Sequence, residues 1–212
     1  MSTVSDTVAA PTTNRSLPPP AQALVRRLRL TCLALVYVLL AVPALALVCL
    51  LTTSLALAII TIGLPLLLAF VPLNQVLADV HRRIAGSILG VRIDADYQVR
   101  RGSSPLDLIR TWAGDPARWR DFAWAWMSAT IGWVLAWIPV GLGLLVLWYA
   151  VFPFVYWVSP EGVFDMDYGI LTIDTQAEAF LEWTWLLVSL VAWWMLVPAV
   201  MHWRARLDRA LL

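Results

Sequence analysis

Residues 30–78 read "LTCLALVYVLLAVPALALVCLLTTSLALAIITIGLPLLLAFVPLNQVLA", an apolar run of 49 residues with only short polar interruptions. A helix needs roughly 20 residues to cross the hydrocarbon core of a bilayer, so this run is long enough for two crossings. We expect spans at about 30–51 and 55–78, joined by a very tight turn at Thr52, Thr53 and Ser54.

The composition of the chain agrees with a membrane protein. Of its 212 residues, 61% are hydrophobic, 14% are charged and 13 are tryptophan. A soluble domain of this length could not bury so much apolar surface. The sequence therefore indicates an integral membrane protein, with the lipid bilayer as its first partner.

Two further apolar segments follow a more polar stretch. One is expected to cross at about 122–150, with Pro139 and Pro153 marking a kink and an exit, and the last at about 178–201. We therefore predict an all-α integral membrane fold. Its four transmembrane helices form two hairpins, accompanied by cytoplasmic interfacial helices and an extracellular loop.

The arginines determine the expected topology. All 15 basic residues are arginine, and none lies between Arg120 and Arg204. Because arginine is enriched on the cytoplasmic side of membrane proteins, both termini and the connection at 80–120 should be cytoplasmic. The loops after the first and third spans should face outward, in a multi-pass protein of the cell (plasma) membrane.

We expect two parts along the chain. Residues 1–23 are rich in Ser, Thr, Ala and Pro and have no hydrophobic period, which predicts a disordered cytoplasmic tail, and residues 24–212 form one membrane domain. In the connection between the second and third spans, Ser104 before Pro105 is typical of a helix N-cap with a first-turn proline. A short helix lying at the membrane surface is expected there.

No catalytic or metal-binding pattern stands out in the sequence. It contains no glycine-rich phosphate loop, no Cys/His cluster with metal spacing and no serine in a nucleophile elbow. Cys32 and Cys49 are too far apart on one helix to form a disulfide, and His81 and His202 sit among arginines at the inner boundary. We expect no enzymatic activity, no cofactor and no nucleic-acid partner.

Charged residues of the spans are expected at the span ends, which disfavours a pump or an ion-coupled transporter. The acidic residues concerned are Asp79, Asp121, Glu178 and Glu182. Asn74 and Gln75 are amides within a span, and we expect them to hydrogen-bond a neighbouring helix.

The outer loop "SPEGVFDMDYGILTIDTQAE", residues 159–178, is a candidate sensing loop. Its acidic residues could attract cations or cationic peptides; they are Glu161, Asp165, Asp167, Asp174 and Glu178. The segment begins like a calcium-binding EF-hand but departs from it at Gly169 and Gln176, so an EF-hand is rejected. The alternative is that acids simply populate the side from which arginine is excluded.

The segment "GDPARWRDFAWAWM", residues 114–127, places charges directly before the third span. Asp115 before Pro116 predicts an N-cap with a proline in the first turn. Trp119 would anchor the helix at headgroup depth, while Arg118 and Arg120 would meet anionic lipid. The motif is either a topology anchor alone or a rigid point through which movement of the outer loop reaches the cytoplasmic segments.

Three stretches together carry a family resemblance: residues 61–93, "TIGLPLLLAFVPLNQVLADVHRRIAGSILGVRI", residues 114–127 quoted above, and residues 205–212, "ARLDRALL". The chain resembles the sensor domain family of actinobacteria, a four-span membrane module that occurs alone or N-terminal to histidine kinases. The resemblance implies a role in two-component signal transduction. It also implies candidate coupling residues, which are Gly63, Pro65, Asp115, Pro116, Trp119, Arg120 and Asp121.

From the resemblance we expect a non-catalytic membrane sensor or signalling accessory protein, with a histidine kinase or another membrane protein as its partner. A homo-oligomer stays open. The alternative is a structural subunit or assembly factor of a membrane complex, to which the small residues Ser128 and Gly132 would contribute a packing surface.

Overall fold

The computed structural model describes residues 18–98, 104–160, 166–167, 172–173 and 175–212, and within them the chain is almost entirely helical. Four helical segments are long and apolar enough to cross a membrane, so the chain is a multi-pass membrane protein. These segments are α1 (Pro19–Leu57) with η1 (Ala58–Ile60), α2 (Gly63–Leu89), α4 (Pro116–Met127) with η2 (Ser128–Gly132) and α5 (Trp133–Val158), and α6 (Gln176–Leu181) with α7 (Trp183–Leu211).

Three smaller elements lie between the long segments. Helix α3 (Pro105–Ala113) begins with the predicted N-cap: the Ser104 hydroxyl accepts from the backbone N–H of Asp107 at 3.1 Å. Its location at a membrane surface stays a prediction. The sequence did not predict strands β1 (Met166–Asp167) and β2 (Thr172–Ile173), which pair antiparallel between α5 and α6.

Both ends of the first long helix differ from the prediction. Of the predicted tail, residues 1–17 lie outside the described residues, and α1 begins at Pro19, within the predicted tail. The predicted turn at Thr52–Ser54 is wrong, because α1 continues through it to Leu57. The hydroxyls of Thr52 and Ser54 donate to the helix's own carbonyls one turn earlier, at 2.7 and 2.6 Å, and so do not interrupt it.

The turn between the first two spans lies instead at Thr61 and Ile62. Thr61 adopts a left-handed conformation with φ of 66°, and α2 starts at Gly63. A Cβ on Gly63 would collide with the backbone carbonyl of Ser54, so only glycine lets α2 begin so close to α1. Gly63 is therefore explained by close helix packing.

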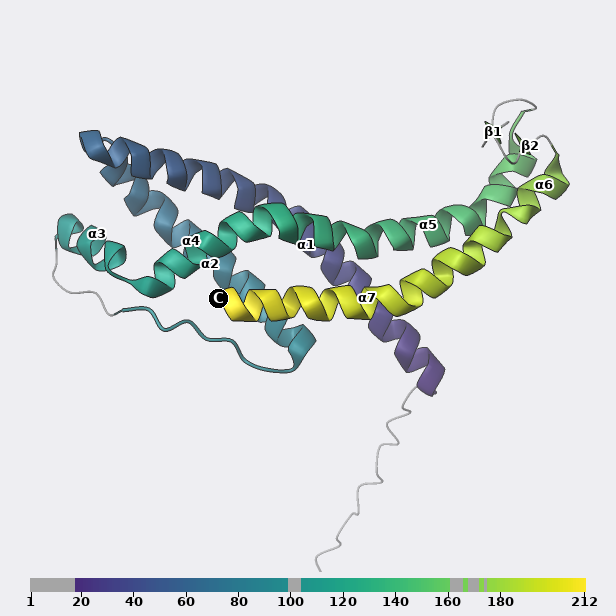
Figure 1. Ribbon diagram of the computed structural model, residues 1–212, viewed down its shortest axis with the longest axis horizontal. Helices are drawn as coiled ribbons and strands as arrows, with labels where there is room; N and C mark the ends of the chain where they lie inside the picture. The colour runs from purple at the N-terminus through teal and green to yellow at the C-terminus, as the bar shows by residue number, and fades with distance from the viewer. Residues whose placement is uncertain (1–17, 99–103, 161–165, 168–171, 174) are drawn as a thin grey trace, which may run out of the picture.

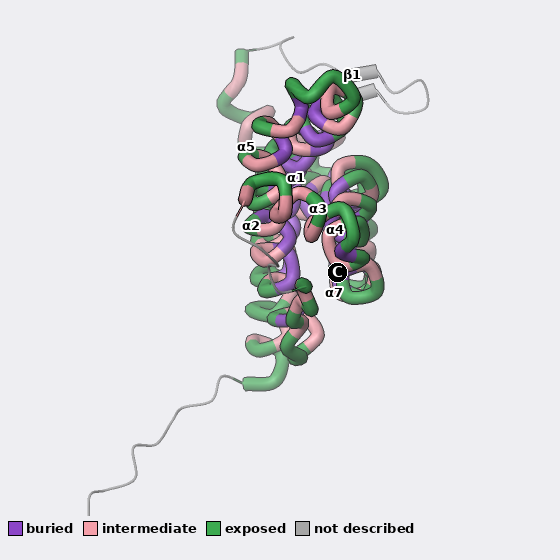
Figure 2. Tube along the Cα trace, turned by 90° about the vertical axis from the view of Figure 1, so that its left-hand side faces the viewer, coloured by how far each residue is buried: buried purple, intermediate pink, exposed green. Residues whose placement is uncertain are grey.

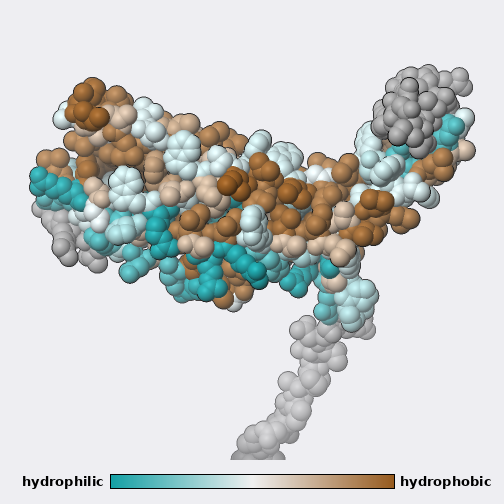
Figure 3. All heavy atoms as spheres, viewed as in Figure 1, coloured by the Kyte–Doolittle hydropathy of each residue, from teal (hydrophilic) through white to brown (hydrophobic). Residues whose placement is uncertain are grey.

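The four long segments form two arms that share a common centre (Figure 1). We call α1 with α2 the first arm and α5 with α7 the second arm. The helices within each arm run antiparallel, and the arms cross near the middle of the molecule and diverge from there. Figure 2 shows buried residues along this middle region, and Figure 3 shows hydrophobic residues over both arms with hydrophilic ones along the lower edge.

Small and medium apolar residues fill the crossing and let the helices approach closely. One core group joins α1 to α5 and α7 and includes Ala34, Ala136 and Val197. Another joins α1 to α2 and α4 and includes Ala44 and Ala78. The first arm is thus packed against both halves of the third long segment.

Prolines within the spans leave the helices continuous. Pro139 and Pro153 both lie inside α5, which runs on to Val158, so Pro153 does not mark an exit. In α7, Pro198 has no N–H for the Trp194 carbonyl four residues earlier. Arg27 of α1 donates to that carbonyl at 2.9 Å, and its guanidinium lies 3.6 Å from the centre of the Trp194 ring. A cation of the first arm thus supplies the hydrogen bond that Pro198 cannot donate.

Candidate functional site

Asp115 begins α4 as the sequence predicts. One carboxylate oxygen accepts from the backbone N–H of Ala117 at 3.0 Å, and Pro116 stands in the first turn. The other oxygen accepts from the backbone N–H of Gln98 at 3.1 Å. Since Asp115 is only 1% exposed, a single buried carboxylate both caps α4 and holds the connection that leads to α3.

Trp119 and Arg120 each bind backbone carbonyls of another element. The indole N–H of Trp119 donates to the Ala113 carbonyl at 2.9 Å, which ties α4 to the end of α3. Arg120 donates to the carbonyls of Leu211 and Ala210 at 3.2 and 3.3 Å. A cation is favoured at the C-terminal end of a helix, so Arg120 holds the end of α7 beside α4. The expected contacts of both side chains with lipid headgroups stay predictions.

Asp121 belongs to a group of polar side chains that we call the Asp121 cluster: Asp79, Arg82, Tyr97 and Asp121. Arg82 of α2 donates to Asp121 of α4, and to Asp79 at 2.6 Å. The Tyr97 phenol donates to Asp121 at 2.5 Å and accepts from Arg82 at 2.8 Å. Burial, and then the hydrogen bond to Asp121, raise the pKa of Tyr97 above its usual range, so the phenol stays a donor. The cluster joins α2, the connection between α2 and α3, and α4.

A second polar group lies at the crossing of the arms, and we call it the Asp208 cluster: Tyr37, Trp124, Ser128, Arg204 and Asp208. Asp208 of α7 is fully buried. It accepts from the Tyr37 hydroxyl of α1 at 2.9 Å and from the Trp124 indole N–H of α4 at 3.1 Å. A buried carboxylate needs such donors, so Asp208 fixes α7 to two other spans.

Arg204 lies one turn before Asp208 and is 1% exposed. It donates to the Ser128 hydroxyl at 2.8 Å, and its guanidinium lies 4.8 Å from the centre of the Tyr37 ring. Its Nε is 3.7 Å from Asp208 Oδ2, which is an ion-pair separation but too long for a hydrogen bond. The cation and the carboxylate therefore compensate each other within one face of α7.

Gly132 makes room for this cation. A Cβ at Gly132 would stand where the Arg204 guanidinium lies. The residues from Ser128 to Gly132 form the π-helical turn η2 between α4 and α5, and such turns are frequent at functional sites. Ser128 and Gly132 are both buried by the chain's own Arg204. They do not form the packing surface for another protein that the sequence suggested.

His81 lies between the aromatic rings of the Asp208 cluster. Its ring centre is 5.3 Å from that of Tyr37 and 4.5 Å from that of Trp124. Its Nδ1 donates to the Leu77 carbonyl at 3.0 Å, since a carbonyl can only accept. Its Nε2, and Nη1 and Nε of Arg204, are buried without a hydrogen-bond partner among the described residues. The crossing of the arms thus contains polar atoms whose pairing is incomplete.

The candidate sensing loop lies at the far end of the second arm from these clusters (Figure 1). Glu161, Asp165 and Asp174 lie outside the described residues. Asp167 is part of β1. Glu178 lies in the first turn of α6, where its side chain accepts from the backbone N–H of Thr175 at 2.9 Å as half of a capping box. The structure thus gives Glu178 a role in starting α6.

The candidate coupling residues divide into two groups. Asp115, Pro116, Trp119, Arg120 and Asp121 share the start of α4 and contact α2, α3, α7 and the connection between α2 and α3. Gly63 and Pro65 lie at the other end of α2, at the tip of the first arm. The structure therefore does not bring the two parts of the motif together.

Sequence reasoning missed the members of the Asp208 cluster. The sequence uses Arg204 only as a basic residue that sets the topology, and it does not single out Asp208. The signal that could have found them is their spacing, because Val197, Met201, Arg204 and Asp208 follow one helical face and all four are buried. Among the residues that the structure describes, no group of three or more His, Cys, Asp or Glu could hold a metal ion.

Comparison with known proteins finds one family. A family model described as "Putative sensor" matches residues 33–212, which include most of the first span, the other three spans, the start of α4 and both polar clusters. No curated protein and no solved structure matches the chain.

Proposed function

The chain belongs to this sensor family, and we propose that it is a non-catalytic membrane sensor or signalling accessory protein. It relays an envelope signal to a cytoplasmic or membrane partner such as a histidine kinase. The signal enters at the outer loop, moves α7 relative to the other spans and changes the cytoplasmic connection between α2 and α3.

The observation that carries the proposal is the position of Asp208. It lies near the end of α7, the long helix that follows the outer loop and α6, and it binds donors from α1 and α4. A displacement of α7 therefore cannot leave the Asp208 cluster unchanged. A movement at one end of this helix would alter hydrogen bonds about 40 Å away, given a rise of 1.5 Å per residue.

The start of α4 supports an output towards the cytoplasmic connection. Asp121 and Asp115 hold Tyr97 and Gln98 of that connection. Arg120, between them, binds the last carbonyls of α7. The first two turns of α4 thus contact both the element proposed to move and the segment proposed to respond.

A relay also needs two arrangements of similar free energy. The atoms at the crossing of the arms that are buried without a hydrogen bond support this: Nε and Nη1 of Arg204 and Nε2 of the adjacent His81 would gain hydrogen bonds in a different arrangement. Buried polar atoms without partners raise the free energy of the state in which they are found. A shift of α7 that pairs them would therefore be favourable enough to offset some repacking.

The test uses the native host with the gene deleted and then restored as wild type or as a variant. Asp208→Asn removes the buried carboxylate of the cluster, and Arg206→Gln removes an exposed charge of the same helix as the matched control. Immunoblots of membrane fractions check that all forms reach the same level. Transcript responses to osmotic shock and to cell-wall antibiotics are the readout.

We expect deletion and Asp208→Asn to abolish at least one envelope response, and wild type and Arg206→Gln to restore it. A deletion that leaves every response intact would contradict the sensor proposal. Purification under each condition separates the alternative, since a structural subunit or assembly factor would keep a constant stoichiometric complex whatever the stimulus. A sensor would show an association with its partner that depends on the stimulus.

A further inference from the structure

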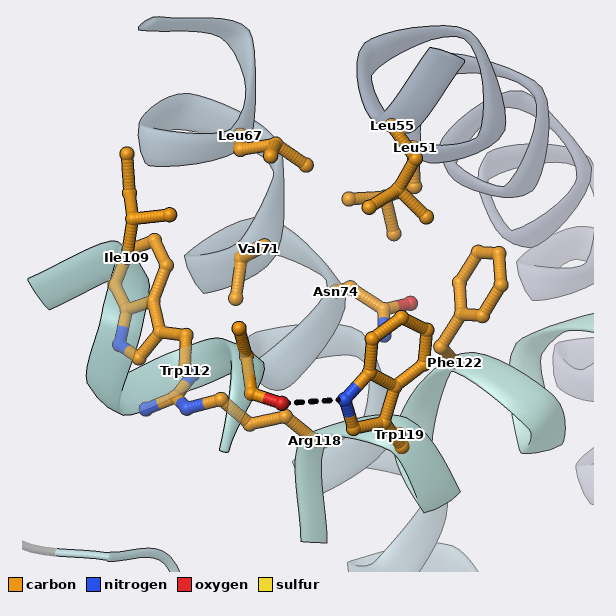
Figure 4. A pocket seen from close by; sticks show the side chains of 11 residues that line it. Leu51, Leu55, Leu67, Val71, Asn74, Ile109, Trp112, Arg118, Trp119 and Phe122 are labelled. Carbon is orange, nitrogen blue, oxygen red and sulfur yellow. Dashed lines mark hydrogen bonds between the residues drawn. The ribbon is translucent and has the colours of Figure 1, made fainter. Parts of the chain in front are cut away.

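A cavity of about 100 Å³ lies between the first arm and the α3–α4 turn. Its walls come from four helices and are almost wholly apolar (Figure 4); they are Leu51, Leu55, Leu67, Val71, Ile109, Trp112, Ala113, Trp119 and Phe122. Apolar cavities of about 150 Å³ take up ligands the size of benzene. There is room here for a short piece of an alkyl chain.

Asn74 is the uncharged polar side chain of this cavity. It is 4% exposed, and its Oδ1 is buried without a hydrogen-bond partner, whereas its neighbour Gln75 accepts from Arg118 of α4 at 3.3 Å. The expected bond to a neighbouring helix therefore forms at Gln75, and Asn74 Oδ1 is left without one. An unpaired amide oxygen in apolar surroundings is unfavourable, so the missing partner is a hydrogen-bond donor brought by a ligand.

Arg118 is the charged side chain of the cavity, and its charge is already compensated. Its Nε lies 3.4 Å from Asp115 Oδ2 in an ion pair, and its guanidinium covers the rings of Trp112 and Tyr97, at 5.0 Å from each centre. An anionic ligand would therefore meet a neutral pair in place of a free cation. This charge balance favours a neutral ligand.

We propose that the cavity binds a neutral, hydroxyl-bearing amphiphile of the bilayer, with its alkyl part between α1 and α2 and its hydroxyl donating to Asn74. The bilayer is the medium around these spans, so such molecules reach the cavity without crossing water. The ligand would also contact Trp119, whose indole N–H bond to Ala113 fixes the α3–α4 turn. The proposal concerns binding alone and does not depend on the sensor role.

The probe is a photoactivatable diazirine analogue of dodecanol, used with the full chain in phosphatidylcholine vesicles. Diazirine analogues of dodecane and of dodecanoate, of equal length, separate hydrocarbon binding and anion binding from hydroxyl recognition. Crosslinks are mapped by mass spectrometry. Asn74→Leu removes the acceptor, and Val71→Trp fills the cavity. Val76→Leu is the control, because Val76 lies on the same helix and is 61% exposed.

We expect the alcohol probe to label the cavity walls, with labelling reduced about fivefold in Asn74→Leu, as for loss of one neutral hydrogen bond, and lost in Val71→Trp. Val76→Leu should behave as wild type. Equal labelling by the dodecane probe would show an apolar cavity without hydroxyl recognition. Stronger labelling by the dodecanoate probe would show an anion site. If no probe crosslinked to the cavity walls of the wild-type protein, the cavity would not be a binding site. Equal dodecane labelling, stronger dodecanoate labelling and the absence of crosslinks would each overturn the proposal.

Discussion

Gly132→Ala offers the sharpest test of the crossing between the arms. In an ordinary helical position, alanine in place of glycine stabilises a helix by about 1 kcal/mol. At position 132 the added Cβ would occupy the place of the Arg204 guanidinium. Helix propensity alone therefore predicts that Gly132→Ala stabilises the protein, whereas the contact with Arg204 predicts that it destabilises the protein.

The magnitude follows from the contacts of Arg204. Displacing it breaks the bond to Ser128 and separates the cation from Asp208, which stays buried. Removing one partner of a buried ion pair costs about 3–5 kcal/mol, and the helix gain of about 1 kcal/mol offsets little of it. We expect a net loss of stability of about 2–4 kcal/mol and a fall in Tm on the order of 10 °C.

Thermal unfolding of the purified protein in detergent measures the effect. Gly141→Ala is the matched control, because a Cβ there meets nothing within 4 Å, and its Tm should be unchanged or slightly higher. Arg204→Met combined with Gly132→Ala should cost no more than Arg204→Met alone, since both remove the same interaction. If Gly132→Ala melted like Gly141→Ala, the placement of Arg204 against η2 would be wrong.

Three further predictions concern single side chains. Tyr37→Phe removes one donor from the buried Asp208 carboxylate and should lower the unfolding free energy by about 1–3 kcal/mol, measured by denaturant titration; a change below experimental error would speak against that bond. Asp115→Ala should cost about 1 kcal/mol through the lost N-cap and speed amide hydrogen exchange at Gln98, whereas unchanged exchange would refute the contact between them. The raised pKa of Tyr97 means that its phenol stays protonated in the folded protein as the pH rises past about 10. Its contribution to stability is therefore complete below that pH and is lost as the pH rises further, through the raised pKa. A phenolate absorbance step near pH 10 in the difference between wild type and Tyr97→Phe would contradict this.

Local signals predicted the parts of the fold that depend on neighbouring residues. Run length and hydropathy predicted four spans, and the described residues contain four helical segments long and apolar enough to cross a membrane. Asp115 and Ser104 were predicted as N-caps, and both side chains accept from the first turn of their helices. Such features need only a few consecutive residues, which is why the sequence suffices for them.

Features that depend on contacts between spans could not be predicted. Thr52 and Ser54 suggested a turn because they are polar, but the helix satisfies their hydroxyls itself, and the real turn depends on how closely α2 approaches α1 at Gly63. Asp208 pairs with Tyr37, 171 positions away. The local sequence around either residue does not indicate that the other is its hydrogen-bond partner.

The π-helical turn η2 sets the register between two stretches of one continuous helix. Before it, α4 presents Trp124 to α7 and Asp121 to α2, and after it α5 presents Ala136 and Val140 to the core group shared with α1 and α7. Converting this wide turn to α-helix would take up one residue, which corresponds to a rotation of about 100° about the helix axis. Such a rotation of α5 relative to α4 would carry Ala136 and Val140 away from their partners in α1 and α7.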